Sequence, residues 1–240
     1  HPMSFVYPVN NFYQVIANNA KSDPQKTIVF EDEHKISNQQ LLAQADAVAD
    51  FLIQRGIRRG DKVALVMSNS WHYLAIMFAI SKVGAVAVPI NNFLKHDELV
   101  YVLTDSQSCL LFASAKFNTE VRDLIIKTNV ASIVWVDGAP LENERNFDYA
   151  KIGSTPGSST ESVNPALDDL AVIIYTSGTT GKPKGAMLSY RNLLSIVYGA
   201  IAHYKLKKGQ ARMICYLPMF HAFTLAVTML LPIVTSSGVV

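Results

Sequence analysis

The chain has 240 residues, of which 50% are hydrophobic and 17% are charged, and its formal net charge is +2. This composition is typical of a globular protein with a large core, and it excludes an intrinsically disordered chain. The charge is too balanced for an electrostatic grip on nucleic acid or on an anionic membrane, so we expect a small-molecule partner, no nucleic acid and at most peripheral contact with a membrane.

The first clear helix signal is a capping box at Ser37-Asn-Gln-Gln40, with Ile36 and Leu41 placed to form a hydrophobic staple. Apolar residues then recur at helical spacing as far as Leu52, and Gly56 suits the left-handed residue that closes such a helix. A buried strand is predicted next, over residues 62–67.

Helices and strands alternate after this point. The apolar pattern predicts helices over 71–83, 97–104 and 119–127, and strands over 86–90, 109–113 and 132–136. Four apolar strands separated by helices imply right-handed crossovers and a buried parallel sheet. The predicted fold is therefore α/β, with a doubly wound, mostly parallel sheet covered by helices on both faces.

The chain divides by composition into three parts. Residues 3–150 form the first α/β subdomain, and 151–169 form a loop or linker because Gly153 to Thr160 contains only glycine, serine, threonine and proline. Residues 170–240 begin a second α/β subdomain. Its predicted elements are strands over 170–175, 185–189 and 213–217, and a helix over 192–204 with one apolar face formed by Leu193, Val197, Ile201 and Tyr204.

The two cysteines, Cys109 and Cys215, each lie in an apolar run, which predicts buried core thiols in a reducing compartment. Their spacing matches no metal motif, so no metal site is expected within the chain. The two longest apolar stretches, Tyr73 to Ile90 and Ala222 to Val234, fail as membrane spans, since the first is interrupted by a lysine and a glycine and the second is too short. We expect a cytoplasmic protein.

The segment Tyr175-Thr-Ser-Gly-Thr-Thr-Gly-Lys-Pro-Lys-Gly185 carries the strongest chemical signal. Directly after a predicted strand it holds three glycines, four hydroxyl side chains and two lysines. Glycines allow backbone N–H groups to turn toward one point, and hydroxyls and lysines add donors and positive charge, which together suit a polyphosphate. A plain surface hairpin would not need this many donors and cations.

This loop is not a Walker A motif. That motif has four residues between its first glycine and the Gly-Lys pair, followed by serine or threonine, whereas Gly178 and Gly181 are separated by two residues and Pro183 follows Lys182. A P-loop nucleotide hydrolase is thereby disfavoured.

The loop resembles that of the adenylate-forming superfamily, which includes AMP-forming acyl-CoA synthetases, firefly luciferase and the adenylation domains of peptide synthetases. The resemblance extends to Gly60-Asp-Lys-Val-Ala64, to the run from Ala79 to Ile90 and to Leu217-Pro-Met-Phe-His-Ala222, in the order that the family uses. It spans nearly the whole chain from Phe12 to Val240, and it implies that the fold is the N-terminal part of the large domain of an adenylating enzyme.

The resemblance implies an AMP-forming acyl-CoA synthetase. A carboxylate attacks the α-phosphate of Mg-ATP, pyrophosphate leaves, and the acyl-adenylate forms a thioester with coenzyme A, so that ATP, Mg²⁺ and coenzyme A are the expected cofactors. Such chemistry depends on positioning and charge stabilisation. Lys184 would stabilise the phosphate charge, Lys182 would be auxiliary, and the β- and γ-phosphates would lie against Thr176, Ser177, Gly178, Thr179, Thr180 and Gly181.

His221 matches the family histidine beside the acyl pocket and the reacting phosphate. Taken alone, a histidine among apolar residues is more often structural, and the motif reverses that preference. The apolar stretch from Phe223 to Leu231 would form one wall of the acid pocket, or it is a buried helix. The family commonly has a Ser/Thr-His pair after its loop, whereas this chain has Ser189-Tyr190, which favours a packing role for Tyr190.

The sequence contains neither the family's Tyr-Gly-x-Thr-Glu and Thr-Gly-Asp segments nor its hinge and C-terminal lysine. We therefore expect the chain to be a portion of a longer enzyme that by itself binds ATP weakly and does not turn over. The predicted substrate is a medium- or long-chain fatty acid. Aryl-CoA ligases, acyl-carrier-protein ligases and peptide-synthetase adenylation domains stay open, as does a different class, a nucleotide-binding or interaction module without catalysis.

Overall fold

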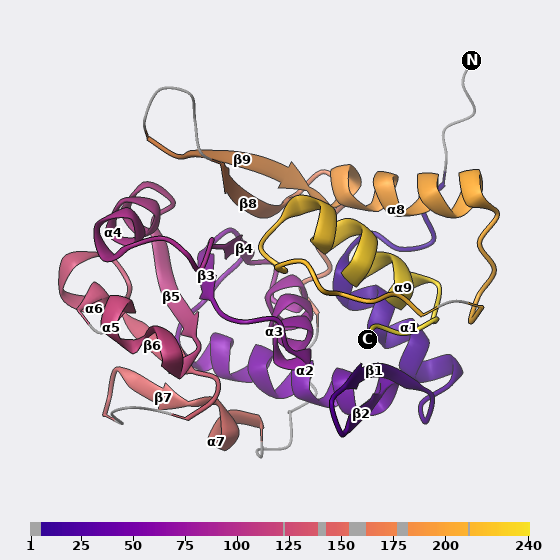
Figure 1. Cartoon of the computed structure of the whole chain (residues 1–240), viewed down its shortest axis with the longest axis horizontal. Helices are drawn as coiled ribbons and strands as arrows, with labels where there is room; N and C mark the ends of the chain where they lie inside the picture. Colours follow the sequence, from indigo (N-terminus) through magenta and orange to yellow (C-terminus); the bar gives the residue numbers. More distant parts are fainter. Residues whose placement is uncertain (1–5, 122, 139–142, 154–161, 177–181, 211) are drawn as a thin grey trace.

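A seven-stranded sheet forms the centre of the molecule in the computed structural model, which describes residues 6–121, 123–138, 143–153, 162–176, 182–210 and 212–240 (Figure 1). Neighbouring strands are parallel except for the last pair, which is antiparallel. This confirms the mostly parallel α/β sheet. In order across the sheet, the strands are β7 (Asn146–Asp148), β6 (Ser132–Trp135), β5 (Ser108–Ala113), β3 (Lys62–Val66), β4 (Val86–Pro89), β8 (Leu170–Thr176) and β9 (Lys184–Ser189).

Helices cover both faces of the sheet, because successive residues of a strand point to opposite sides. Val63 and Leu65 of β3 enter one core cluster, whereas Ala64 and Val66 enter the other. The first face is covered by α1 (Phe12–Ser22), α2 (Asn38–Gln54), α3 (Trp71–Lys82), α7 (Tyr149–Gly153), α8 (Tyr190–Tyr204) and α9 (Leu231–Val234). The second is covered by α4 (His96–Asp105), α5 (Asn118–Val121) and α6 (Leu124–Lys127), which lie together on the left of Figure 1.

The sequence signals for the ends of the first helices are confirmed. The hydroxyl of Ser37 accepts a hydrogen bond from Gln40 N at 3.2 Å, and the Gln40 side chain accepts one from Ser37 N at 2.8 Å, so the capping box forms at the start of α2. Gly56 closes that helix with φ +82°, and Gly84 adopts φ +69° after α3. Both angles lie in the left-handed region that glycine adopts without strain.

Three predicted elements differ from the structure. The helix over 119–127 is divided into α5 and α6, because Asp123 has φ −96° and ψ 0°, at the margin of the helical region. The apolar face of α8 ends one turn early, and the Tyr204 side chain is 70% exposed because the last turn runs past the core. The strand predicted over 213–217 does not form as a regular strand, since among the described residues its backbone pairs only at Met213 and Cys215, which hydrogen-bond to Gly238 and Val240 around an isolated bridge between Met213 and Val239.

Several elements were not predicted from the sequence. They are α1, the edge strand β7, the short helix α7, the 3₁₀ turn η1 (Ala115–Phe117) and the antiparallel pair formed by β1 (Thr27–Glu31) and β2 (His34–Ser37). The helix that was one interpretation of Phe223 to Leu231 forms as the π-helix η2 (Thr224–Leu230). The polar sequences of β2 and β7 give no apolar run that marks them as strands. Among helices in the described ranges, none is long and apolar enough to cross a membrane.

The sheet continues across the predicted domain boundary, because β8 pairs with β4 at Val172 and Ala87. The division into 3–150, 151–169 and 170–240 stays a prediction, and most of the linker signal, residues 154–161, lies outside the described residues.

Cys109 and Cys215 are free thiols, but both are half-buried rather than fully buried as predicted. Burial raises the pKa of each thiol.

Candidate functional site

The antiparallel pair β8–β9 holds the two ends of the predicted phosphate loop. Thr176 lies opposite Lys184, Tyr175 opposite Gly185 and Ile174 opposite Ala186. Thr176, Lys182 and Lys184 are all exposed. The pairing therefore brings the first hydroxyl of the motif beside its last lysine. The other five predicted phosphate-binding residues lie outside the described residues, namely Ser177, Gly178, Thr179, Thr180 and Gly181.

Helix α4 contacts the loop end of this hairpin through two side chains that the sequence analysis did not single out. The Tyr101 hydroxyl donates to the Pro183 carbonyl at 3.2 Å, and Lys182 Nζ lies 5.5 Å from the centre of the Tyr101 ring. The Tyr175 hydroxyl donates to Asp105 Oδ2 at 2.6 Å. Residues four apart on a helix share a face, which is the only sequence signal that groups Tyr101 with Asp105.

Gly185 is required by packing within the hairpin. A Cβ atom at this position would lie 2.8 Å from Ile173 Cγ2 and 3.1 Å from the Tyr175 ring, closer than carbon atoms approach in well-packed proteins. Burial raises the pKa of Tyr175, and the hydrogen bond to Asp105 raises it further, so the hydroxyl stays protonated and can donate. The glycine thus lets the Tyr175 ring lie across β9 while its hydroxyl reaches α4.

His221 lies at the start of the last helical segment. Its N–H donates to the Pro218 carbonyl at 3.1 Å, closing a turn, and its carbonyl accepts from Leu225 N at 2.9 Å. The imidazole is exposed, and within the ranges that the structure describes no hydrogen bond to it is found. Its neighbours Met219 and Phe220 are buried and fix the turn beneath it. The imidazole therefore faces solvent with both ring nitrogens available.

The segment after His221 supports both sequence interpretations in part. Phe223 is 60% exposed, whereas Leu225, Ala226, Met229 and Leu230 in η2 are buried. Most of the segment is therefore core, and Phe223 alone opens toward solvent beside His221. Tyr190, which stands where the family commonly has histidine, is buried and packs against Phe12 with ring centres 4.8 Å apart.

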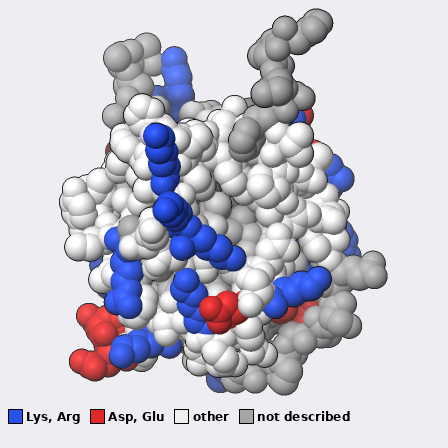
Figure 2. All heavy atoms as spheres, turned by 90° about the vertical axis from the view of Figure 1, so that its right-hand side faces the viewer, with Lys and Arg blue, Asp and Glu red and all other residues white. Residues whose placement is uncertain are grey.

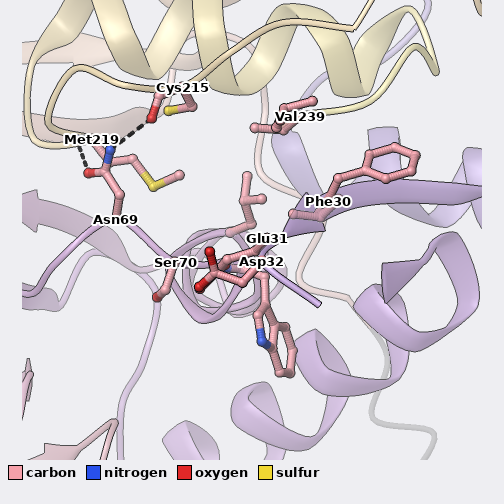
Figure 3. A pocket seen from close by; sticks show the side chains of 12 residues that line it. Phe30, Glu31, Asp32, Asn69, Ser70, Cys215, Met219 and Val239 are labelled. Carbon is pink, nitrogen blue, oxygen red and sulfur yellow. Dashed lines mark hydrogen bonds between the residues drawn. The ribbon is translucent and has the colours of Figure 1, made fainter. Parts of the chain in front are cut away.

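Asn69 connects the loop after β3 to the segment that leads into His221. Its Nδ2 donates to the Cys215 carbonyl at 3.1 Å and to the Leu217 carbonyl at 2.8 Å, and its Oδ1 accepts from Met219 N at 2.8 Å. Figure 3 shows Asn69 beside Cys215 and Met219 at the rim of a cavity of about 260 Å³. On another side of this cavity, Glu31 accepts from Trp71 N at 2.5 Å, and burial raises the pKa of its carboxyl.

Both groups of predicted site residues lie at one edge of the sheet. The strand order reverses between β3 and β5, because β4 lies on one side of β3 whereas β5 to β7 lie on the other. In open α/β sheets, ligands bind outside the carboxyl ends of the strands at such a point. Asn69 follows β3 there, and Thr176 ends β8, which runs parallel to β4 and finishes at the same edge.

Lysine and arginine side chains gather on a different face. Figure 2 shows them on the side that carries β1, β2 and the end of α8. A polar cavity of about 400 Å³ lies in this region, with Lys26, Lys35 and Arg212 among its lining, and the Arg212 guanidinium lies 3.8 Å from the centre of the Phe30 ring. Although the net charge is only +2, basic side chains are therefore concentrated on this surface.

No group of three histidine, cysteine, aspartate or glutamate side chains suited to a metal ion occurs among the residues that the structure places. Magnesium commonly keeps several waters and is held through one or two carboxylates together with substrate phosphates. A polyphosphate at the hairpin would itself supply magnesium ligands, so the described side chains are compatible with a metal that arrives on the nucleotide.

Comparison with known proteins gives consistent matches. The chain is 29% identical over 207 residues to a 2-succinylbenzoate–CoA ligase of Bacillus cereus, a match that covers 86% of this chain and 38% of the relative. The anthranilate CoA ligase AuaEII in complex with anthranoyl-AMP superposes with a TM-score of 0.87 at 22% identity, over 98% of this chain and 45% of that one. A long-chain-fatty-acid-CoA ligase from Archaeoglobus fulgidus gives 0.84 at 25% identity, over 98% and 48%.

The chain thus spans about 38% of the length of the curated relative that it matches. The sequence pattern of the AMP-binding enzyme family matches residues 16–240, which is nearly the whole chain. This chain belongs to the AMP-binding enzyme family.

Proposed function

We propose that this chain supplies the phosphate-binding hairpin of an AMP-forming ligase, which activates a carboxylic acid with ATP and then transfers the acyl group to coenzyme A. The observation that carries the proposal is the pairing of Thr176 with Lys184 at the mouth of a loop rich in glycine and hydroxyl residues. Backbone amides and hydroxyls in such a loop, together with a lysine, form a concave site for phosphates.

Each described site residue has a distinct role in this proposal. Lys184 faces solvent at the mouth of the loop, where its ammonium balances the charge that develops on the leaving pyrophosphate. Lys182 is auxiliary, since its ammonium lies over the Tyr101 ring. His221 lies at the same edge of the sheet with an exposed imidazole, where it contacts the acid and the reacting α-phosphate. Mg²⁺ enters with ATP as the ligand of its phosphates.

The proposed acid is a medium- or long-chain fatty acid, and the exposed Phe223 beside His221 offers an apolar surface for it. A second candidate is an aryl acid, which is favoured by the names of two similar proteins, a 2-succinylbenzoate–CoA ligase and an anthranilate CoA ligase. An aromatic side chain at this position suits either, because it packs against an alkyl chain and stacks on an aryl ring.

Acid-dependent exchange of pyrophosphate into ATP by the full-length protein tests the proposal. The panel contains octanoate, dodecanoate and hexadecanoate as fatty acids, benzoate, anthranilate and 2-succinylbenzoate as aryl acids, and a no-acid control. Exchange that requires one of these acids supports the ligase, and the preferred acid decides between the two substrate classes. A coenzyme A thioester formed from the same acid identifies the acceptor.

Absence of exchange with every acid, despite measurable ATP binding, would contradict the ligase and favour a non-catalytic nucleotide-binding module. Acyl-adenylate formation by residues 1–240 alone would contradict the expectation that this chain does not turn over by itself. The cytoplasmic location stays a prediction, which a fluorescent fusion of the full-length protein checks directly.

A further inference from the structure

We infer that Asn69 is a positioning residue for His221, an inference that rests on the function proposed above. Its amide makes three hydrogen bonds to the backbone of residues that are 146, 148 and 150 positions away along the chain. The amide group has two N–H donors and one carbonyl acceptor, and all three hydrogen bonds go to this one segment. The side chain thus fixes the path of the chain just before His221.

The hydrogen bonds of Asn69 resemble those of a neighbouring strand. The carbonyls of Cys215 and Leu217 are two residues apart, so in extended backbone they point to the same side. Within the described ranges the backbone of 213–217 pairs only at its start, where Met213 N donates to the Gly238 carbonyl and Cys215 N to the Val240 carbonyl. The apolar pattern of 213–217 predicted a strand, and the side chain of Asn69 supplies part of the pairing that a strand would otherwise provide.

The position of Asn69 is itself fixed from both sides of its loop. Ser68 N donates to the Ser114 hydroxyl at 3.2 Å, which ties the loop after β3 to the loop after β5. Trp71 N donates to Glu31, and Tyr73 N donates to the Ser70 carbonyl at 3.0 Å at the start of α3. Asn69 therefore holds the His221 segment over the point where the strand order reverses.

Only a short, constrained stretch separates the held residue Met219 from His221. The His221 N–H closes a turn onto the Pro218 carbonyl, and the ring of Phe220 lies 6.5 Å from that of Phe93 in the loop after β4. Proline restricts the backbone angle φ at the first residue of this turn. A shift of Met219 would therefore be transmitted to the imidazole with little room for compensation.

Asn69 differs from an asparagine that only stabilises the fold. Its side chain is exposed, and hydrogen bonds at an exposed site compete with water, so their loss should affect folding little. Asn19 provides a matched control, because its Nδ2 donates to the Ile233 carbonyl at 2.7 Å and clamps α9, downstream of His221, from a buried position. Both asparagines thus connect the N-terminal part of the chain to the C-terminal part, Asn69 before His221 and Asn19 after it.

The test measures acid-dependent pyrophosphate exchange by the full-length protein for wild type, Asn69→Ala, His221→Ala, the double variant and Asn19→Ala. A displacement of about 1 Å can cost about 10²-fold in rate, so Asn69→Ala should lower kcat by 10-fold to 100-fold. It should leave the KM for ATP unchanged, because the hairpin is held by α4 instead. In the His221→Ala background the same substitution should change the rate by less than threefold. Asn19→Ala should lower Tm more than Asn69→Ala and keep the wild-type kcat.

The outcomes separate the inference from the proposed function. A wild-type protein that exchanges with no acid contradicts the proposed function. An active wild type in which Asn69→Ala behaves like Asn19→Ala, or in which the effects of Asn69→Ala and His221→Ala multiply in the double variant, overturns the inference and leaves the function standing. If Asn69→Ala does not fold, Asn69→Gln replaces it, since a retained amide preserves the donors while the added methylene moves them.

Discussion

The β8–β9 hairpin and the segment from Cys215 to His221 both carry predicted site residues, but they are held in opposite ways. The hairpin is stabilised by pairing between residues close in sequence, from Leu170 opposite Ser189 to Thr176 opposite Lys184. The second segment pairs with other described backbone only at its start, where Cys215 N donates to the Val240 carbonyl, and as far as Met219 it is held by the side chain of Asn69, about 150 residues away. A contiguous motif can therefore be recognised from sequence, whereas a site built by a distant clamp cannot.

The largest expected effect separates the two lysines of the hairpin. Lys184→Met in the full-length protein should lower the rate of pyrophosphate exchange by about 10²-fold to 10³-fold, the usual cost of removing a group that stabilises developing charge. Lys182→Met is the matched control and should cost less than tenfold, since Lys182 lies over the Tyr101 ring. Because both lysines are exposed, the free energy of unfolding should change by less than about 0.5 kcal/mol in either variant. Equal exchange rates for the two variants would contradict the assignment of different roles to Lys184 and Lys182.

A second variant tests how far the hairpin depends on its own packing. Gly185→Ala places a methyl group 2.8 Å from Ile173 Cγ2, so the unfolding free energy should fall by about 1 to 3 kcal/mol. Chemical denaturation measures this change. Gly199→Ala is the control, because a Cβ there meets no atom within 4 Å and alanine favours the helix. A hairpin that accepts Gly185→Ala without loss would be less tightly packed than described.

The contact between Tyr175 and α4 should also appear as a pH dependence. Burial raises the pKa of Tyr175 above its ordinary value near 10, so the folded state holds this proton more tightly than the unfolded chain. Its contribution to stability is complete below pH 10 and is lost as pH rises above that value. The unfolding free energy of wild type should therefore fall more steeply above pH 10 than that of Tyr175→Phe, and equal slopes would contradict the assignment.

The smallest expected effect concerns Tyr101. Tyr101→Phe removes the donor to the Pro183 carbonyl, and one such hydrogen bond contributes about 0.5 to 1.5 kcal/mol. We expect a slight loss of stability and a KM for ATP that rises by a few-fold, with kcat unchanged. Steady-state kinetics of the full-length protein measures both constants. A change in kcat alone would place Tyr101 in the chemical step rather than in the anchoring of the loop.

The sequence predicted what depends on periodicity and on neighbours in the chain. The capping box at Ser37, the left-handed glycines Gly56 and Gly84, and the four central parallel strands belong to this class, because each is set by residues within one element. The hydrophobic pattern around Cys215 predicted a strand over 213–217, whereas in the part of the chain that the structure describes only Met213 and Cys215 pair, with the backbone of residues 238–240. Whether such a segment pairs with another strand depends on which backbone lies beside it, and that is decided by tertiary contacts.

The candidate site shows the same division. Thr176, Lys182, Lys184 and His221 were identified by contiguous motifs, and their roles stay predictions. Asn69, Tyr101 and Asp105 were missed because each acts through a contact with a distant part of the chain. Single asparagines and tyrosines on a loop or helix carry no local signal of such contacts.

The most direct measurement is the affinity of the full-length protein for ATP and for AMP, determined by calorimetry in wild type, Lys184→Met and Lys182→Met. A charge-assisted hydrogen bond contributes about 1.5 to 3 kcal/mol, so the dissociation constant for ATP should rise at least tenfold in Lys184→Met. The constant for AMP, which lacks the β- and γ-phosphates, should stay at the wild-type value. An ATP affinity that is unaffected by Lys184→Met, or an equal loss for AMP, would contradict the claim that the hairpin holds the outer phosphates.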